Sequence, residues 1–317
     1  MDVVILGRVG YDLYSEEPNV PLHRARRFSR YLGGSSANMA VGLSRLGARA
    51  GLISCLGEDP LSRFLVDFLE AEHVETKHIQ RVKQYLPSLC LTEISPPDHF
   101  PQVFYRHQPV DTMLDAQEDD LLYAGSGRMF VTNGTSLCAS PSRESAYRAL
   151  DRAKRAGCTV VLDVDYRAMS WRSAADAGLA IRLALPFLDI LIGNQTELTL
   201  AAGVETLDHA TAWLHQAGVP LLVSKLGEQG TRVLTNTDDV YLPPYNVEVV
   251  STIGAGDGFG SGFLYGILQK LPLIDCLHYG NAAAAIVVSG MSCSEAMPTL
   301  PEVEAMMHHQ KLGASSR

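Results

Sequence analysis

Short apolar runs alternate with amphipathic stretches along most of the chain, and this alternation limits the possible folds more than any other feature. Continuous runs of Val, Ile and Leu are typical of parallel strands buried on both faces, and the stretches between them have helical periodicity. The pattern therefore predicts an α/β protein of three layers, with a mostly parallel central sheet between two layers of helices. The expected strands are Val3–Leu6, Gly51–Leu56, Met129–Thr132, Thr159–Asp163, Asp189–Ile192 and Leu221–Ser224, and the clearest helices are Ala37–Leu46, Leu61–Glu72, Arg143–Ala156 and Thr206–Gln216.

Two segments depart from this alternation. Tyr11–Leu32 and Tyr85–Pro109 contain no stretch with helical periodicity, and the second has strand-like runs at Ser88–Ser95 and Val103–Tyr105 around the turn Pro96–Pro97–Asp98. We expect the two segments to fold as a small β lid over the C-terminal edge of the main sheet, and to form the contact in a homodimer. We take residues 1–317 as a single domain that includes this lid.

Composition and missing motifs exclude several classes of function. The net charge of −9 argues against a general binder of nucleic acid or of anionic membranes, and no apolar run approaches the roughly 18 residues of a membrane helix. The six cysteines form no C-x-x-C pair, and no signal peptide is recognised, so we expect reduced thiols and a cytoplasmic location. The chain lacks a P-loop, H-E-x-x-H, G-x-S-x-G and a complete G-x-G-x-x-G, which argues against the corresponding enzyme classes.

A glycine-rich run is the strongest chemical signal. Gly254-Ala255-Gly256-Asp257-Gly258 lies where an extended run, Val247–Val250, meets a helical region that continues to Met291. Small residues allow close approach of a ligand, and the N–H groups of a helix N-terminus can hold phosphate oxygens. Asp257 could accept a proton from an attacking hydroxyl beside such an anion hole. A plain turn, with Asp257 at a helix start, remains the alternative.

Four further polar runs carry weaker signals, and three of them have a structural alternative. Gly33–Asn38 could hold a substrate against Gly34 and Asn38, or could be a turn with a serine cap. Asn194–Glu197 could place Glu197 near magnesium, or could be a capping box. Asp163–Arg167 follows a predicted parallel strand, at the end where ligands gather. Lys225–Gly230 could border a nucleotide, or could be a hairpin turn.

The order of these runs resembles the ribokinase-like carbohydrate kinases, also called the phosphofructokinase-B family, and the resemblance covers essentially the whole chain. It implies transfer of the ATP γ-phosphoryl group to a sugar hydroxyl, with Mg²⁺. By position, Asp257 matches the catalytic base, and Glu197 matches a residue that acts on Mg²⁺ through water. The other matched residues are Gly254, Ala255 and Gly256 for the anion hole, Asp12, Gly34 and Asn38 for the sugar, and Asn194, Lys225, Gly227, Gly230 and Asn281 for the nucleotide.

Finer features resemble the 5-dehydro-2-deoxygluconokinases of inositol catabolism. They lie in Gly7–Tyr14, Phe104–Arg106, Asp163–Arg167 and Ser292–Pro298. Arginines at the positions of Arg106 and Arg167 also occur in 2-dehydro-3-deoxygluconokinases, and the resemblance implies that this pair binds a substrate carboxylate. A 2-dehydro-3-deoxygluconokinase, a neutral-sugar kinase similar to fructokinase, and a non-catalytic nucleotide or sugar sensor remain the alternatives.

One position departs from the family pattern. Many members have Asp where this chain has Ser251, and that carboxylate helps to form a monovalent-cation site beside the anion hole. The sequence therefore predicts weak activation by potassium, or none.

Overall fold

The computed structural model describes residues 1–96 and 99–315, and its main sheet has nine strands in the order β13-β12-β11-β10-β9-β8-β1-β4-β5. The seven strands from β11 to β5 pair in parallel, and β12 and β13 extend one edge antiparallel. Their bounds are β1 Val3–Leu6, β4 Ala50–Gly57, β5 Glu75–Val82, β8 Met129–Asn133, β9 Thr159–Asp163, β10 Ile190–Asn194, β11 Leu221–Lys225, β12 Thr231–Leu234 and β13 Asp239–Leu242.

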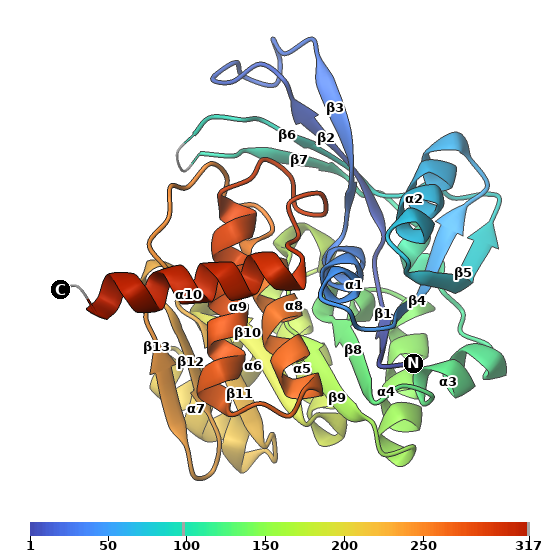
Figure 1. The fold of residues 1–317 in the computed structure, drawn as a ribbon. Coiled ribbons are helices and arrows are strands. Elements are labelled where there is room, and N and C mark those ends of the chain that lie inside the picture. The colour runs from blue at the N-terminus through green and yellow to red at the C-terminus, as the bar shows by residue number, and fades with distance from the viewer. Residues whose placement is uncertain (97–98, 316–317) are drawn as a thin grey trace.

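Helices cover both faces of this sheet (Figure 1). One layer contains α1 Ser35–Arg45, α8 Ala255–Leu268, α9 Leu273–Val288 and α10 Leu300–Ser315; the other contains α3 Glu118–Ala124, α4 Ser142–Arg155, α5 Ala174–Ala184, α6 Gln195–Ala202 and α7 Leu207–Gln216. The central strands are buried on both faces, as their continuous Val, Ile and Leu runs predict. Across residues 1–96 and 99–315, no helix has the length and apolar character needed to cross a membrane.

The expected β lid is a separate four-stranded sheet in the order β3-β2-β6-β7. Its strands are β2 Gly10–Ser15, β3 Phe28–Gly33, β6 Leu89–Thr92 and β7 Gln102–Tyr105. Both lid segments thus pair with each other, and the sheet stands above the C-terminal ends of the main strands (Figure 1). The lid is mixed, because β2 and β6 run parallel. The predicted turn at Pro96–Asp98 lies partly outside the described residues.

The structure also contains elements that the periodicity did not indicate. β5 was not among the expected strands because it is an edge strand of mostly charged and polar residues, ETKHIQRV. α2 Pro60–Ala71 packs against β5, and its bounds are within one residue of the expected helix Leu61–Glu72. The extended run Val247–Val250 is not a strand: it is irregular chain, although the Val250 amide donates to the Val288 carbonyl.

Candidate active site

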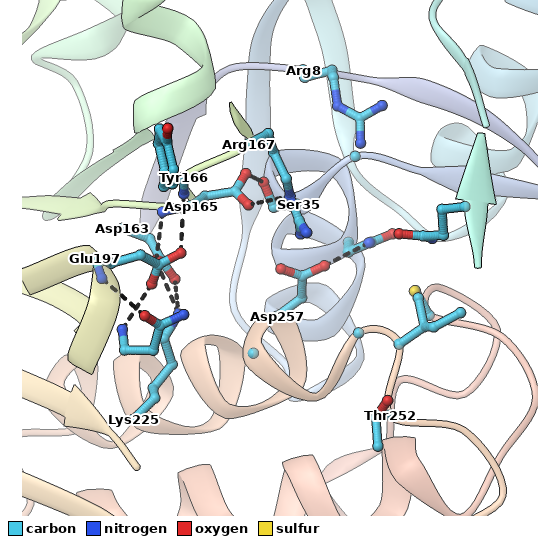
Figure 2. Close-up of a pocket in the computed structure, with 18 of the residues that line it drawn as sticks. Arg8, Ser35, Asp163, Asp165, Tyr166, Arg167, Glu197, Lys225, Thr252 and Asp257 are labelled. Carbon is cyan, nitrogen blue, oxygen red and sulfur yellow. Dashed lines mark hydrogen bonds and ion pairs between the residues drawn. The ribbon is translucent and has the colours of Figure 1, made fainter. Parts of the chain in front are cut away.

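A cavity of about 530 Å³ opens between the lid and the C-terminal ends of the main strands. Residues from the lid, from the start of α1, from the ends of β9, β10 and β11, and from the start of α8 all line it. Figure 2 shows these side chains pointing toward one another from elements far apart in the sequence. Its position is the one expected for an open α/β sheet, where ligands bind beyond the carboxyl ends of parallel strands.

The N-terminus of α8 forms one wall of the cavity. Gly254 caps the helix in the left-handed conformation, with φ 84°, and a Cβ there would meet Cys293 Sγ at 2.8 Å. No side chain caps the first turn of α8, whereas Asn194 caps α6. The start of this 14-residue helix, which opens with Ala255 and Gly256, suits an anion, although the Ala255 amide also donates to the Thr252 carbonyl at 3.4 Å.

Asp257 is in that first turn and faces the cavity. Asn38 Nδ2 donates to Asp257 Oδ2 at 2.7 Å, which links the run Gly33–Asn38 to the glycine-rich run at the start of α8. Burial raises the pKa of Asp257, as does the Asp165 carboxylate, while Asn38, Arg167 and Lys225 oppose the shift. The carboxylate is thus held in place and is more basic than an ordinary aspartate.

Lys225 brings a positive charge to the same wall. Its Nζ lies 3.0 Å from each carboxylate oxygen of Asp163, and it would lie 3.5 Å from a Cβ at Gly256. Burial lowers the pKa of Lys225, but the carboxylates of Asp163 and Glu197 outweigh that effect and raise it. The lysine therefore stays protonated beside the N-terminus of α8.

A chain of hydrogen bonds that is buried beyond its first link positions Arg167. Its Nε donates to Asp165 Oδ1 at 3.0 Å, and Asp165 Oδ2 accepts from the Ser35 hydroxyl at 2.6 Å. Asn133 Nδ2 in turn donates to Ser35 Oγ at 2.6 Å and to Ser36 Oγ at 2.8 Å. Sequence reasoning missed Ser35 and Asn133, because an interior polar network leaves no local pattern.

Asp12 lies on the lid side of the cavity. It is 6% exposed, and its Oδ1 has no hydrogen-bond partner within the structure. Burial raises the pKa of Asp12 to about 6, with Arg8 and Arg167 opposing the shift and Asp257 adding to it. Gly34 lies nearby with φ 96°, and a Cβ there would meet the Arg8 carbonyl oxygen at 2.5 Å. A buried carboxylate oxygen without a donor is suited to a ligand hydroxyl.

Glu197 belongs to a capping box and also lines the cavity. Asn194 and Glu197 form the capping box, and Glu197 also accepts from the Tyr166 amide at 3.0 Å. Both residues nevertheless line the cavity. Among the residues that the structure describes, no cluster of three or more metal-ligating side chains was found.

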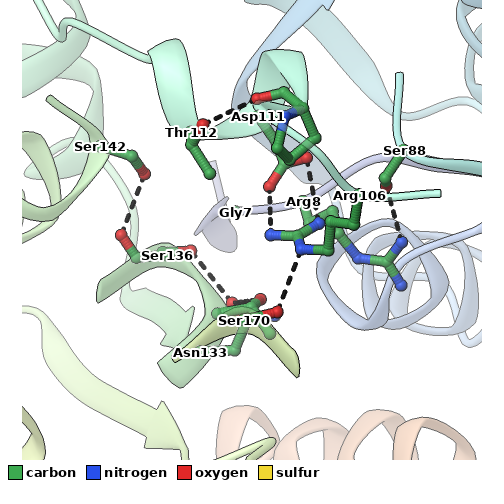
Figure 3. Close-up of polar contacts among 12 residues, drawn as sticks. Gly7, Arg8, Ser88, Arg106, Asp111, Thr112, Asn133, Ser136, Ser142 and Ser170 are labelled. Atoms are coloured by element: carbon green, nitrogen blue, oxygen red, sulfur yellow. Dashed lines mark hydrogen bonds and ion pairs between the residues drawn. The ribbon is translucent and has the colours of Figure 1, made fainter. Parts of the chain in front are cut away.

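Not every predicted site residue reaches the cavity lining. The Arg106 side chain is 6% exposed and is not part of the lining; it donates to both carboxylate oxygens of Asp111 at 3.1 and 2.6 Å and to Ser170 Oγ at 3.1 Å (Figure 3). Asn281 accepts from Thr231 and donates to the Pro243 carbonyl. Gly230 and Ala255 are also absent from the lining, whereas Gly227 is part of it.

Arg8 lines the cavity although the sequence assigned it no role. It lies two residues after the end of β1, and its Nη1 donates to Ser88 Oγ at 2.9 Å (Figure 3). Its position at the carboxyl end of a buried parallel strand was the one available signal.

Comparison with known proteins gives matches over nearly the whole chain. The profile of the pfkB family of carbohydrate kinases matches residues 1–300. The 5-dehydro-2-deoxygluconokinase of Geobacillus kaustophilus is 34% identical over 100% of this chain and 96% of its own. That of Clostridium tetani is 35% identical over 98% and 94%. Among solved structures, the fructokinase of Vibrio cholerae with fructose, ADP and calcium superposes with a TM-score of 0.84, at 22% identity over 97% of this chain and 99% of its own.

Proposed function

The chain belongs to the pfkB family of carbohydrate kinases, and on that premise we propose that it transfers the γ-phosphoryl group of ATP to 5-dehydro-2-deoxygluconate, a sugar acid. The observation that carries the kinase chemistry is the placement of Asp257 beside the uncapped N-terminus of α8, in one cavity with Lys225 and Arg167. The substrate is proposed from the relatives, which share a third of their residues with the chain over nearly its full length.

In this proposal Asp257 is the base. The Asn38 hydrogen bond fixes the carboxylate, and its raised pKa increases its affinity for the proton of the attacking hydroxyl. The amides of Gly254, Ala255 and Gly256 and the Lys225 ammonium stabilise the charge on the transferring phosphoryl group. Such a reaction depends on positioning and electrostatics more than on covalent chemistry by the protein.

The two substrates occupy opposite sides of Asp257. We assign Asp12, Gly34 and Asn38 to the hydroxyls of the sugar, because all three line the cavity and buried oxygens of Asp12 and Asn38 have no hydrogen-bond partner. Asn194, Lys225 and Gly227 border the nucleotide. Gly230 and Asn281 support the nucleotide side indirectly. Gly230 stabilises the β11–β12 turn, and Asn281 stabilises the chain after β13.

Magnesium fits this site as a companion of the nucleotide. Glu197 faces the cavity while its oxygens accept backbone N–H groups, so it suits an ion bound through water and phosphate oxygens. When bound, Mg²⁺ would neutralise charge on the phosphates. We propose no monovalent-cation site, since Ser251 supplies a hydroxyl and not a carboxylate.

Two further properties stay proposals. All six cysteines are free thiols, which supports a cytoplasmic location. Val103 and Tyr105 on β7 are 47% and 65% exposed, which supports a homodimer formed through the lid.

Release of ADP, measured across a panel of sugar acids and neutral sugars, tests the function. We expect the highest kcat/KM with 5-dehydro-2-deoxygluconate and a lower value with 2-dehydro-3-deoxygluconate. A preference for fructose would move the function to the neutral-sugar alternative. Tight ATP binding without turnover on any sugar would instead favour the sensor.

A further inference from the structure

Arg8 differs from the other cations of the cavity in its partners. Arg167 is paired with Asp165, and Lys225 is paired with Asp163. Among the ion pairs of residues 1–96 and 99–315, none includes Arg8, whose one side-chain hydrogen bond runs from Nη1 to Ser88 Oγ. Its Nε and Nη2 groups are therefore open to a ligand. A half-buried guanidinium with spare donors in a cavity is suited to an anion.

The location of Arg8 suits the end of the substrate that does not react. Arg167 lowers the pKa of Asp257 as well as that of Asp12, and it thus acts close to the proposed base. Arg8 opposes the shift of Asp12 more strongly than Arg167 does. In Figure 2 the Arg167 guanidinium lies beside Asp257, and the Arg8 guanidinium lies farther from Asp257 than that of Arg167 does. In a six-carbon sugar acid the carboxylate and the primary hydroxyl are at opposite ends of the carbon chain, so a hydroxyl at Asp257 directs the carboxylate away from it.

Arg106 is not available to bind the substrate carboxylate. The sequence predicts that Arg106 and Arg167 together bind the substrate carboxylate, but Asp111 already accepts two hydrogen bonds from Arg106. Both members of that pair are nearly buried, with side chains 6% and 4% exposed. Breaking it to free Arg106 would leave a buried carboxylate without its partner, which is strongly unfavourable.

We propose that Arg8 binds the carboxylate of the substrate and so selects acidic sugars over neutral ones. The inference rests on the proposed sugar-acid kinase function and names the residue that sets its specificity. Ser88, at the start of the second lid segment, orients the guanidinium by accepting from Nη1. Two donors of a planar guanidinium can then meet the two carboxylate oxygens in parallel, which an ammonium cannot do.

Charge can be removed from either partner to test this contact. We would measure kcat and KM for 5-dehydro-2-deoxygluconate and for its primary amide, in the wild type and in Arg8→Gln and Arg8→Lys. Arg8→Gln should lower kcat/KM for the acid roughly 10- to 150-fold, mostly through KM, and should change the amide little. For the acid, kcat/KM of Arg8→Lys should lie between the values of the wild type and of Arg8→Gln, because lysine keeps the charge without the paired geometry. Arg24→Ala, an exposed lid arginine with no side-chain contact to the cavity, is the matched control.

The outcomes separate this inference from the function on which it rests. Equal losses on acid and amide would overturn the role of Arg8, because they would show that it only supports Asp12 or the fold. A wild type that uses acid and amide equally well would overturn it without any variant, and this comparison keeps the test valid if the variants misfold. A wild type that phosphorylates no sugar acid would overturn the function itself and the inference with it.

Discussion

Replacing Asp257 by Asn removes the proposed base while leaving its surroundings intact. Asn38 Nδ2 donates to Asp257 Oδ2, and an amide oxygen at that position can accept the same hydrogen bond, so the fold should persist. The variant cannot take the proton of the attacking hydroxyl. A positioned general base contributes about 10²- to 10⁴-fold, so kcat should fall by at least about 10²-fold, which corresponds to about 2.7 kcal/mol in the barrier.

Steady-state assays at saturating ATP and sugar acid would give kcat, and calorimetric titration would give the affinity for ATP. The affinity should change little, because the nucleotide side of the cavity is formed by Asn194, Lys225 and Gly227. Asp275→Asn is the matched control, since Asp275 is also in the first turn of a helix but lies outside the cavity. A kcat for Asp257→Asn close to that of the wild type would remove Asp257 from the mechanism.

Three other predictions follow from the same cavity. Burial raises the pKa of Asp12 from 3.8 to about 6, so its ionisation destabilises the fold as pH rises through that value. Asp12→Asn should therefore add up to about 3 kcal/mol to the free energy of unfolding at pH 8 and nothing at pH 3. Denaturant titrations at the two pH values test this, and equal effects at both would contradict it. Because the base acts when deprotonated and burial raises the pKa of Asp257, kcat/KM should decline on the acid side at a higher pH than the usual pKa of an aspartate; a rate that stays level down to pH 4 would argue against this. Because Ser251 replaces a carboxylate, potassium should activate weakly or not at all, and a large rise in kcat at constant ionic strength would refute that expectation.

The sequence predicted the body of the fold because buried parallel strands are locally apolar. Val3–Leu6 and Thr159–Asp163 coincide with β1 and β9, and the remaining expected strands differ from the observed ones by a residue or two at their ends. β5 was missed for the opposite reason: its mostly charged and polar residues lie at a sheet edge, where burial does not demand an apolar run. The sequence pattern therefore indicates strands where helices cover both faces of the sheet.

The site was predictable where it depends on backbone and on local spacing. The glycine run at the start of α8 and the capping box at Asn194 are both where the sequence placed them. Partners distant in the chain were not predictable: Lys225 and Asp163 are 62 residues apart, and Ser35 and Asp165 are 130 apart. An arginine that binds a substrate and one that binds an aspartate look alike in sequence, which is why Arg106 and Arg8 could not be told apart there.

The most direct test of the central claim is to identify the product. The wild type, ATP, Mg²⁺ and 5-dehydro-2-deoxygluconate should yield one phosphate ester of the sugar acid for each ADP released, as followed by ³¹P NMR and mass spectrometry. The ester should be absent with Asp257→Asn at the same time point. Release of ADP with inorganic phosphate and no ester, or faster ester formation on fructose than on the sugar acid, would contradict the account.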